Sequence, residues 1–199
     1  MVTSTDALGE LTDLITTHLA DGTTQVMIVA VDGASAAGKT VLAEHLAASD
    51  ASAGTVSVVH TDDIAWHHSF FGWHDLLRTG ILERVRSGSL PIAYRPPGWE
   101  RHHRAGAVVV PETTRVLVVE GVGAAHLSIA DLLDVVVWVQ TPADVRDYRQ
   151  RERLRAGIDS PEFMDDWNTH EHQFHRQDMP WTRADYMISG NDLRIRHAG

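Results

Sequence analysis

The chain has 199 residues, a length typical of one domain, and its hydrophobic fraction of 43% is ordinary for a globular protein. A net charge of -10 argues against a nucleic-acid-binding surface, and the absence of cysteine excludes disulfides and thiolate metal sites. The sequence has no signal-peptide pattern and no apolar run near the ~20 residues of a membrane span, which predicts a cytoplasmic protein without membrane partners.

The N-terminal segment, residues 1–22, is predicted to form a helix over residues 5–20. Its leucines and an isoleucine recur at helical spacing, and Asp21-Gly22 marks its end. Further along, four β-rich apolar runs are predicted to be strands: 25–31, 55–60, 115–119 and 135–140. They are nearly continuous rather than alternating, which is typical of strands buried on both faces of a parallel sheet.

The segments between these strands are compatible with helices, which predicts the α/β class. A last strand is expected at 186–189, and the short run 107–110 before Pro111 is expected to be an edge or accessory strand. Residues 88–106 are rich in glycine, proline and arginine and are predicted to be a long functional loop.

A phosphate-binding motif follows the first strand and precedes a helix-compatible stretch that starts near Val41. It matches G-x-x-x-x-G-K-[ST] at every fixed position and consists of Gly33, Ala34, Ser35, Ala36, Ala37, Gly38, Lys39 and Thr40. Backbone N–H groups of such a loop point at phosphate oxygens, Lys39 would reach the β- and γ-phosphates, and Thr40 would ligate Mg²⁺. The alternative is a chance glycine turn.

Acidic residues follow the second and third strands. In an open α/β sheet the ligand lies beyond the carboxyl ends of the strands, so Asp62, Asp63 and Glu120 are expected to face the phosphate loop. Asp62 is the candidate base for a substrate hydroxyl, and Glu120 the candidate partner of a hydrated Mg²⁺. The alternatives are helix capping by the aspartates and a capping or salt-bridging Glu120.

Two helices are predicted near the C-terminus, with Thr141-Pro142 and Ser160-Pro161 at their starts; the second is expected to run to about residue 177. Five arginines fall within ten residues of the first: Arg146, Arg149, Arg151, Arg153 and Arg155. On a closing segment they could neutralise a transferring phosphoryl group, so residues 146–158 are predicted to be a lid. Interleaved acids also allow a solvated, salt-bridged helix.

The 13 histidines do not match a recognised metal motif, and most are expected to be surface or pocket residues. Glu171 and His175 could pair on one helix, and a zinc site at the histidine clusters is the alternative. The aromatic residues after Asp63, from Trp66 to Trp73, are expected to belong to the core.

Over residues 25–190 the chain resembles the uridine kinase-like P-loop kinases. The resemblance rests on the phosphate loop, Asp62-Asp63, Glu120-Gly121, the arginine-rich segment and Ala184-Asp185-Tyr186. It implies one P-loop domain over 1–199: a three-layer sandwich with a parallel sheet of about five strands, a substrate-binding insertion at 64–106 and a small lid.

The resemblance also implies roles for individual residues. Asp62, Lys39 and Arg151 would be catalytic, Glu120 would assist Mg²⁺ with Thr40, and Arg149 and Arg153 would contact ATP along with the phosphate loop and Val41. The substrate would be held by Asp62, Asp63, Asp75, Tyr94, His102, His103 and Arg151. The chain departs from the uridine kinase pattern at Arg95, Ala156, Ile158 and the displaced Trp66. These departures weaken the prediction of uridine as the substrate more than the prediction of kinase activity.

The hypothesis is an enzyme that uses ATP and Mg²⁺ to phosphorylate an alcohol acceptor, in the first place a nucleoside 5′-hydroxyl. Nicotinamide riboside and pantothenate-like acceptors are alternatives, as are an ATPase or switch and a binding module without turnover. The lack of an Asn-Lys-x-Asp motif argues against a GTPase. Many members of the family that the chain resembles form oligomers, so a homo-oligomer is also compatible with the resemblance.

Overall fold

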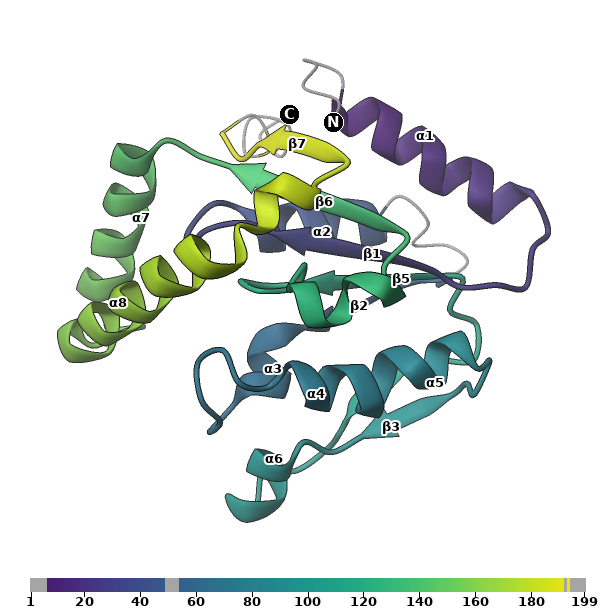
Figure 1. The fold of residues 1–199 in the computed structure, drawn as a ribbon, viewed down its shortest axis with the longest axis horizontal. Coiled ribbons are helices and arrows are strands. Elements are labelled where there is room, and N and C mark those ends of the chain that lie inside the picture. The colour runs from purple at the N-terminus through teal and green to yellow at the C-terminus, as the bar shows by residue number, and fades with distance from the viewer. Residues whose placement is uncertain (1–6, 49–53, 192, 194–199) are drawn as a thin grey trace.

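The four predicted apolar runs and the predicted last strand pair as one parallel sheet in the order β2-β5-β1-β6-β7 (Figure 1). The structure is a computed structural model that describes residues 7–48, 54–191 and 193. The strands are β1 (Met27–Asp32), β2 (Val56–His60), β5 (Val116–Glu120), β6 (Val135–Gln140) and β7 (Tyr186–Ser189). All adjacent pairs are parallel, so the five carboxyl ends meet at one edge. This confirms the predicted α/β sheet.

Successive residues of each central strand enter two separate cores, because side chains alternate between the faces of a sheet. Ile28 and Ala30 of β1 join one core, and Val29 and Val31 join the other. Helices α1 (Ala7–Ala20) and α2 (Lys39–Ala48) cover the second face. The first face is covered by α4 (His74–Leu77), the π-helix η1 (Arg78–Leu82), α5 (Glu83–Arg86) and the 3₁₀-helix η2 (Leu127–Leu132). The predicted three-layer sandwich is confirmed.

The predicted loop 88–106 contains regular structure, so that expectation was wrong in part. Strand β3 (Ile92–Tyr94) pairs antiparallel with β4 (Val108–Val110), and α6 (Pro97–Arg101) lies between them. Each element is only three to five residues long, too short to give a periodic signal. The accessory strand expected before Pro111 is β4. The small helix α3 (Thr61–Ala65) connects β2 to this region.

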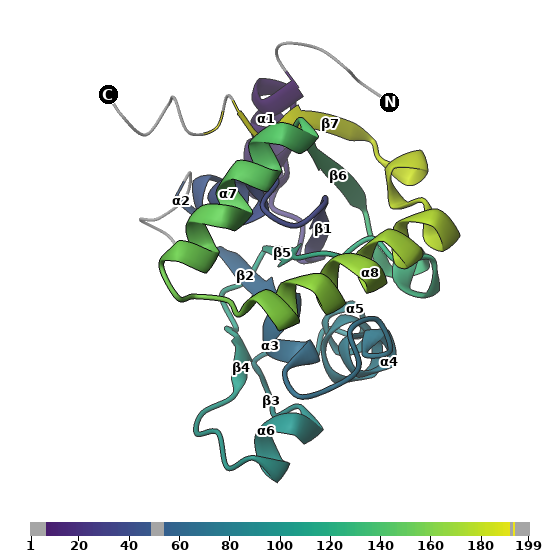
Figure 2. The same ribbon diagram turned by 90° about the vertical axis from the view of Figure 1, so that its left-hand side faces the viewer.

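Helix α7 (Ala143–Arg155) leads away from the end of β6, and α8 (Pro161–Asp178) runs back toward β7 (Figures 1 and 2). Ser160 caps α8 as predicted, accepting a hydrogen bond from Phe163 N. Thr141 does not cap α7: Pro142 is the N-cap residue, and the Thr141 hydroxyl bonds to Ala37 O instead. The chain then passes through the 3₁₀-helix η3 (Pro180–Arg183) into β7. None of the described helices is long and apolar enough to cross a bilayer.

Candidate active site

The phosphate loop joins β1 to α2 and requires glycine at its first position. Gly33 has φ +154°, and a Cβ there would lie 2.5 Å from the Val139 carbonyl oxygen. Lys39, the sole lysine of the sequence, is 8% exposed, and its Nζ donates to Ala34 O at 3.0 Å. Val41 packs into the core beneath the loop. The loop therefore presents a buried ammonium group beside the backbone N–H groups expected to receive phosphate.

Side chains from distant elements bond to the rest of the loop. The Arg149 guanidinium donates to Ala36 O at 2.9 Å and also to Gly190 O, which links α7 to the loop and to the end of β7. From α8, the Glu171 carboxylate accepts from Ser35 N at 2.5 Å. The structure thus gives Glu171 a partner in the phosphate loop, where the sequence had suggested His175.

Asp32, the last residue of β1, is an important residue that sequence reasoning missed. Its carboxylate is fully buried and accepts from the backbone N–H groups of Gly33, Gly123 and Ala125. Burial raises the pKa of Asp32 to about 6, opposed by these hydrogen bonds and by Lys39. The carboxylate joins the phosphate loop to the loop after β5. The sequence did contain a signal for Asp32, since it is an acidic residue at the end of an apolar run, as Glu120 is.

Glu120, at the end of β5, lies beside the first residues of α2. Thr40 Oγ1 donates to Glu120 Oε1 at 3.2 Å, and His60 Nδ1 lies 2.7 Å from Glu120 Oε2. The carboxylate raises the pKa of His60, chiefly through this hydrogen bond. Thr40 and Glu120 offer hard oxygen atoms side by side, the donor type that Mg²⁺ prefers. Within the described residues, no group of three or more His, Cys, Asp or Glu side chains could hold a metal ion.

Asp62 is accessible to solvent in the first turn of α3. Its pKa is raised, first by desolvation among the surrounding protein atoms and then by the negative charge of Glu120, while Lys39 opposes the shift. The charge of Asp62 also acts on Arg153 of α7. The ends of β2 and β5 therefore bring Asp62 and Glu120 close enough for their charges to interact with each other and with that of Lys39.

Asp63 is held by an arginine that sequence reasoning did not single out. Arg104 Nη2 lies 2.7 Å from Asp63 Oδ1, and the Arg104 guanidinium lies 3.7 Å from the centre of the Trp99 ring. The Trp99 Nε1–H donates to the backbone oxygen of Asp63 at 2.8 Å. These contacts join α6 to α3 and fix the residue next to Asp62.

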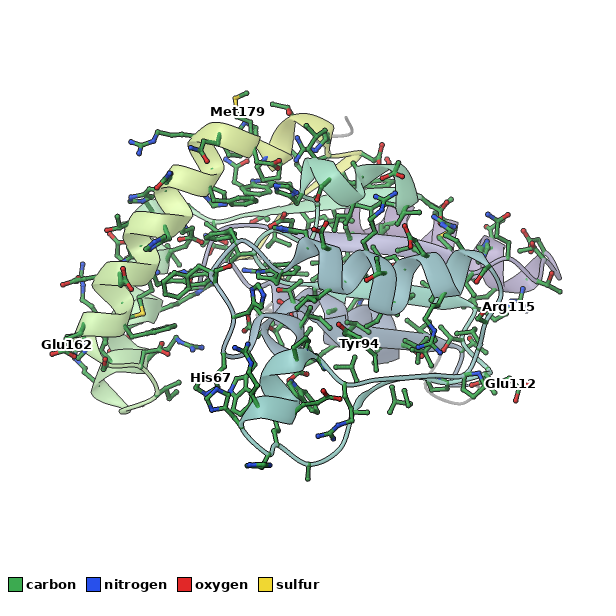
Figure 3. All side chains as sticks on the ribbon, turned by 60° about the horizontal axis from the view of Figure 1, so that its bottom comes forward. His67, Tyr94, Glu112, Arg115, Glu162 and Met179 are labelled. Carbon is green, nitrogen blue, oxygen red and sulfur yellow. The ribbon has the colours of Figure 1, made fainter. Side chains whose placement is uncertain are left out.

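The other predicted substrate residues are spread over the insertion. Asp75 is exposed on α4, and the Tyr94 ring packs against Gly80 of η1, where a Cβ would lie 2.6 Å from the ring. His102 is exposed and stacks on His67, with 3.9 Å between ring centres, and His103 is exposed beside it. His67 and Tyr94 lie well apart in Figure 3. The substrate roles of these residues stay predictions.

The predicted lid helix α7 buries none of its residues. Arg151 is exposed, Arg153 pairs with Asp159 at 2.7 Å, and Arg155 pairs with Glu152. The surface ion pairs match the alternative of a solvated, salt-bridged helix, while Arg149 bonds to backbone oxygens of the phosphate loop. The closing motion of a lid remains a prediction.

Gly121, directly after Glu120, should be sensitive to any side chain. It has φ +148°, and a Cβ there would lie 1.7 Å from Thr61 Oγ1, the residue before Asp62. We expect Gly121→Ala to lower the free energy of unfolding by about 1–3 kcal/mol, measured by urea denaturation. Gly88→Ala is the matched control, because Gly88 also has positive φ but nothing within 4 Å of its Cβ position. Equal losses in the two variants would contradict the packing argument.

Comparison with known proteins adds a sequence relative and two related folds. No protein-family model matches the chain. A curated uridine kinase from Halobacterium salinarum is 35% identical over 127 residues, which cover 61% of this chain and 55% of the relative. The chain therefore matches little more than half the length of that relative.

Among solved structures, a possible uridine kinase from Bacillus stearothermophilus superposes with a TM-score of 0.61 at 20% identity, covering 92% of this chain and 97% of that one. A candidate fructose transport system kinase from Silicibacter sp. TM1040 gives 0.57 at 19% identity, covering 90% and 98%. At sequence identities this low, the two structures indicate a similar fold and nothing about function. Over part of its length the chain is similar in sequence to a uridine kinase, and its fold is similar to those of the two solved structures.

Proposed function

We propose that the protein is an ATP-dependent kinase of a small alcohol, with a nucleoside 5′-hydroxyl as the first candidate acceptor. The observation that carries the proposal is the placement of Asp62. It is accessible, it shares an electrostatic environment with Lys39 and Glu120, and it follows β2, whose last residue His60 pairs with Glu120 of β5. The partial match to a uridine kinase supports the same activity class.

The reaction would divide its tasks among residues already described. The loop N–H groups and Lys39 would bind the β- and γ-phosphates. The Asp62 carboxylate would accept the proton of the acceptor hydroxyl as that oxygen bonds to the γ-phosphorus and the bond to the β–γ bridging oxygen breaks. Thr40 and Glu120 would hold Mg²⁺, which when bound neutralises charge on the phosphate oxygens. Arg153, whose charge interacts with that of Asp62, would stabilise the transferring group.

The direct test is ADP release from ATP in the presence of Mg²⁺, measured with a panel of nucleosides, nicotinamide riboside, pantothenate and sugars. Fructose belongs in the panel because one neighbour by fold is a candidate fructose transport system kinase. The proposal predicts turnover with at least one acceptor and its loss in Asp62→Asn. ATP hydrolysis that no acceptor stimulates would instead favour an ATPase or switch.

The pH dependence of kcat/KM should report the raised pKa of Asp62. A base must be ionised to accept a proton, so activity should fall as pH decreases through this pKa, above the range of an ordinary aspartate. The charge of His60 lowers the pKa of Asp62, so His60→Gln should move the acidic limb to higher pH. A limb that stays in place in His60→Gln would contradict the assignment of the limb to Asp62.

A further inference from the structure

Glu171 is a buried carboxylate in contact with the phosphate loop, and the proposed reaction does not use it. It lies on α8, whose ends are marked in Figure 3 by Glu162 and Met179, and it is 2% exposed. It accepts the Ser35 backbone N–H at 2.5 Å across a sequence separation of 136 residues. Burial raises the pKa of Glu171, and the Ser35 N–H together with the charges of Lys39 and Arg146 opposes this shift and favours the carboxylate form.

The position of this contact is what makes it informative. Backbone N–H groups of a phosphate loop, together with its lysine, form the anion-binding surface on which a triphosphate is bound. Glu171 is itself an anion, and it takes one of these N–H groups and lies within the field of Lys39. A triphosphate bound to the same loop would face a like charge at close range, which weakens binding.

Helix α8 also contacts the segment that follows α3. The Phe174 ring stacks on Phe71 with 4.3 Å between ring centres, and Trp167 contacts both Phe70 and Phe71. The helix that carries Glu171 to the phosphate loop is therefore the one that packs against the chain just beyond Asp62. One helix therefore contacts both the phosphate loop and the segment that follows α3.

We propose that Glu171 is a displaceable internal anion, which occupies the phosphate loop through Ser35 and is released from it when a nucleoside triphosphate binds. This inference rests on the nucleotide site of the proposed function. Binding of a triphosphate to the loop would break the bond between Glu171 and Ser35. The occupancy of the nucleotide site and the packing of α8 on Phe71 would then be coupled. Without the charge of Glu171, the loop should bind polyphosphate more tightly.

The test compares Glu171→Gln with wild type by isothermal titration of ATP, ADP and adenosine. Glutamine keeps the shape and an acceptor oxygen for Ser35 N but removes the charge. We expect ATP to bind about threefold to tenfold tighter, because the repulsion between the Glu171 carboxylate and the bound phosphates is removed. ADP should gain less and adenosine nothing. Glu162→Gln, an exposed site on the same helix, is the control for net charge and should match wild type.

Hydrogen exchange at the Ser35 amide provides a second readout that does not depend on turnover. The amide should be protected in nucleotide-free wild type and exchange faster in Glu171→Ala, with protection of the β1 amides unchanged. ATP binding that is unchanged or weaker in Glu171→Gln, or equal Ser35 protection in Glu171→Ala, would overturn the proposal. Failure of wild type and variant alike to bind ATP overturns it together with the nucleotide site, whereas tight binding without any phosphorylated acceptor overturns only the kinase.

Discussion

Asp62→Asn should lower kcat by about 10²–10⁴-fold, the usual contribution of a positioned general base, while ATP still binds. Asparagine has nearly the same shape as aspartate but cannot accept the proton of the acceptor hydroxyl. The loss should therefore appear in kcat rather than in the dissociation constant of ATP. Steady-state ADP release and equilibrium ATP titration on the same preparation measure the two quantities.

The neighbouring aspartate provides the matched control. Asp63 is bonded to Arg104, and the adjacent indole N–H fixes its backbone, so its carboxylate is already committed within the protein. Asp63→Asn keeps an acceptor oxygen for Arg104 and should reduce kcat less than Asp62→Asn does. Equal losses in the two variants would mean that the α3 turn matters as a structural unit and that Asp62 is not the base.

Lys39→Met should lower kcat/KM for ATP by about 10²–10³-fold, comparable to the loss of one donor aimed at developing charge. The ammonium group bonds to Ala34 O within the loop, and methionine fills a similar volume without charge or donor. Tripolyphosphate binding, followed by calorimetry, should weaken in parallel.

Lys39→Arg distinguishes charge from shape at this position. The side chain is buried, and a planar guanidinium donates in a different geometry from the compact lysine ammonium group. We therefore expect Lys39→Arg to recover only a small part of the lost activity. Full recovery would show that long-range charge alone, and not the donor position, supports phosphate binding.

The parallel sheet could be predicted because its strands are buried on both faces. Residues Val135 to Val139 are all apolar. A continuous apolar run of this length is typical of a strand buried on both faces of a parallel sheet. The phosphate loop could be predicted because its chemistry is local: Gly33, Lys39 and Thr40 lie within eight residues. Local patterns of this kind do not depend on how the rest of the chain packs.

The contacts that complete the site could not be predicted because they join distant segments. Glu171 and Ser35 are 136 residues apart, and Arg104 and Asp63 are 41 apart. Nothing in the sequence near Thr141 indicates that its hydroxyl bonds to Ala37 O rather than capping α7. The elements β3 and α6 were missed for a different reason, since three to five residues carry too little pattern.

Having only one lysine gives the protein an unusual chemical selectivity. Apart from the α-amino group of the chain, Lys39 is the only primary amine available for acylation or reductive alkylation, since every other basic side chain is arginine or histidine. That amine lies 8% exposed inside the loop where phosphate is expected to bind. Once the α-amino group is blocked, an amine-directed fluorophore or crosslinker would act as a site-specific probe without any engineered cysteine, and its rate of attachment would measure how much of the loop is filled.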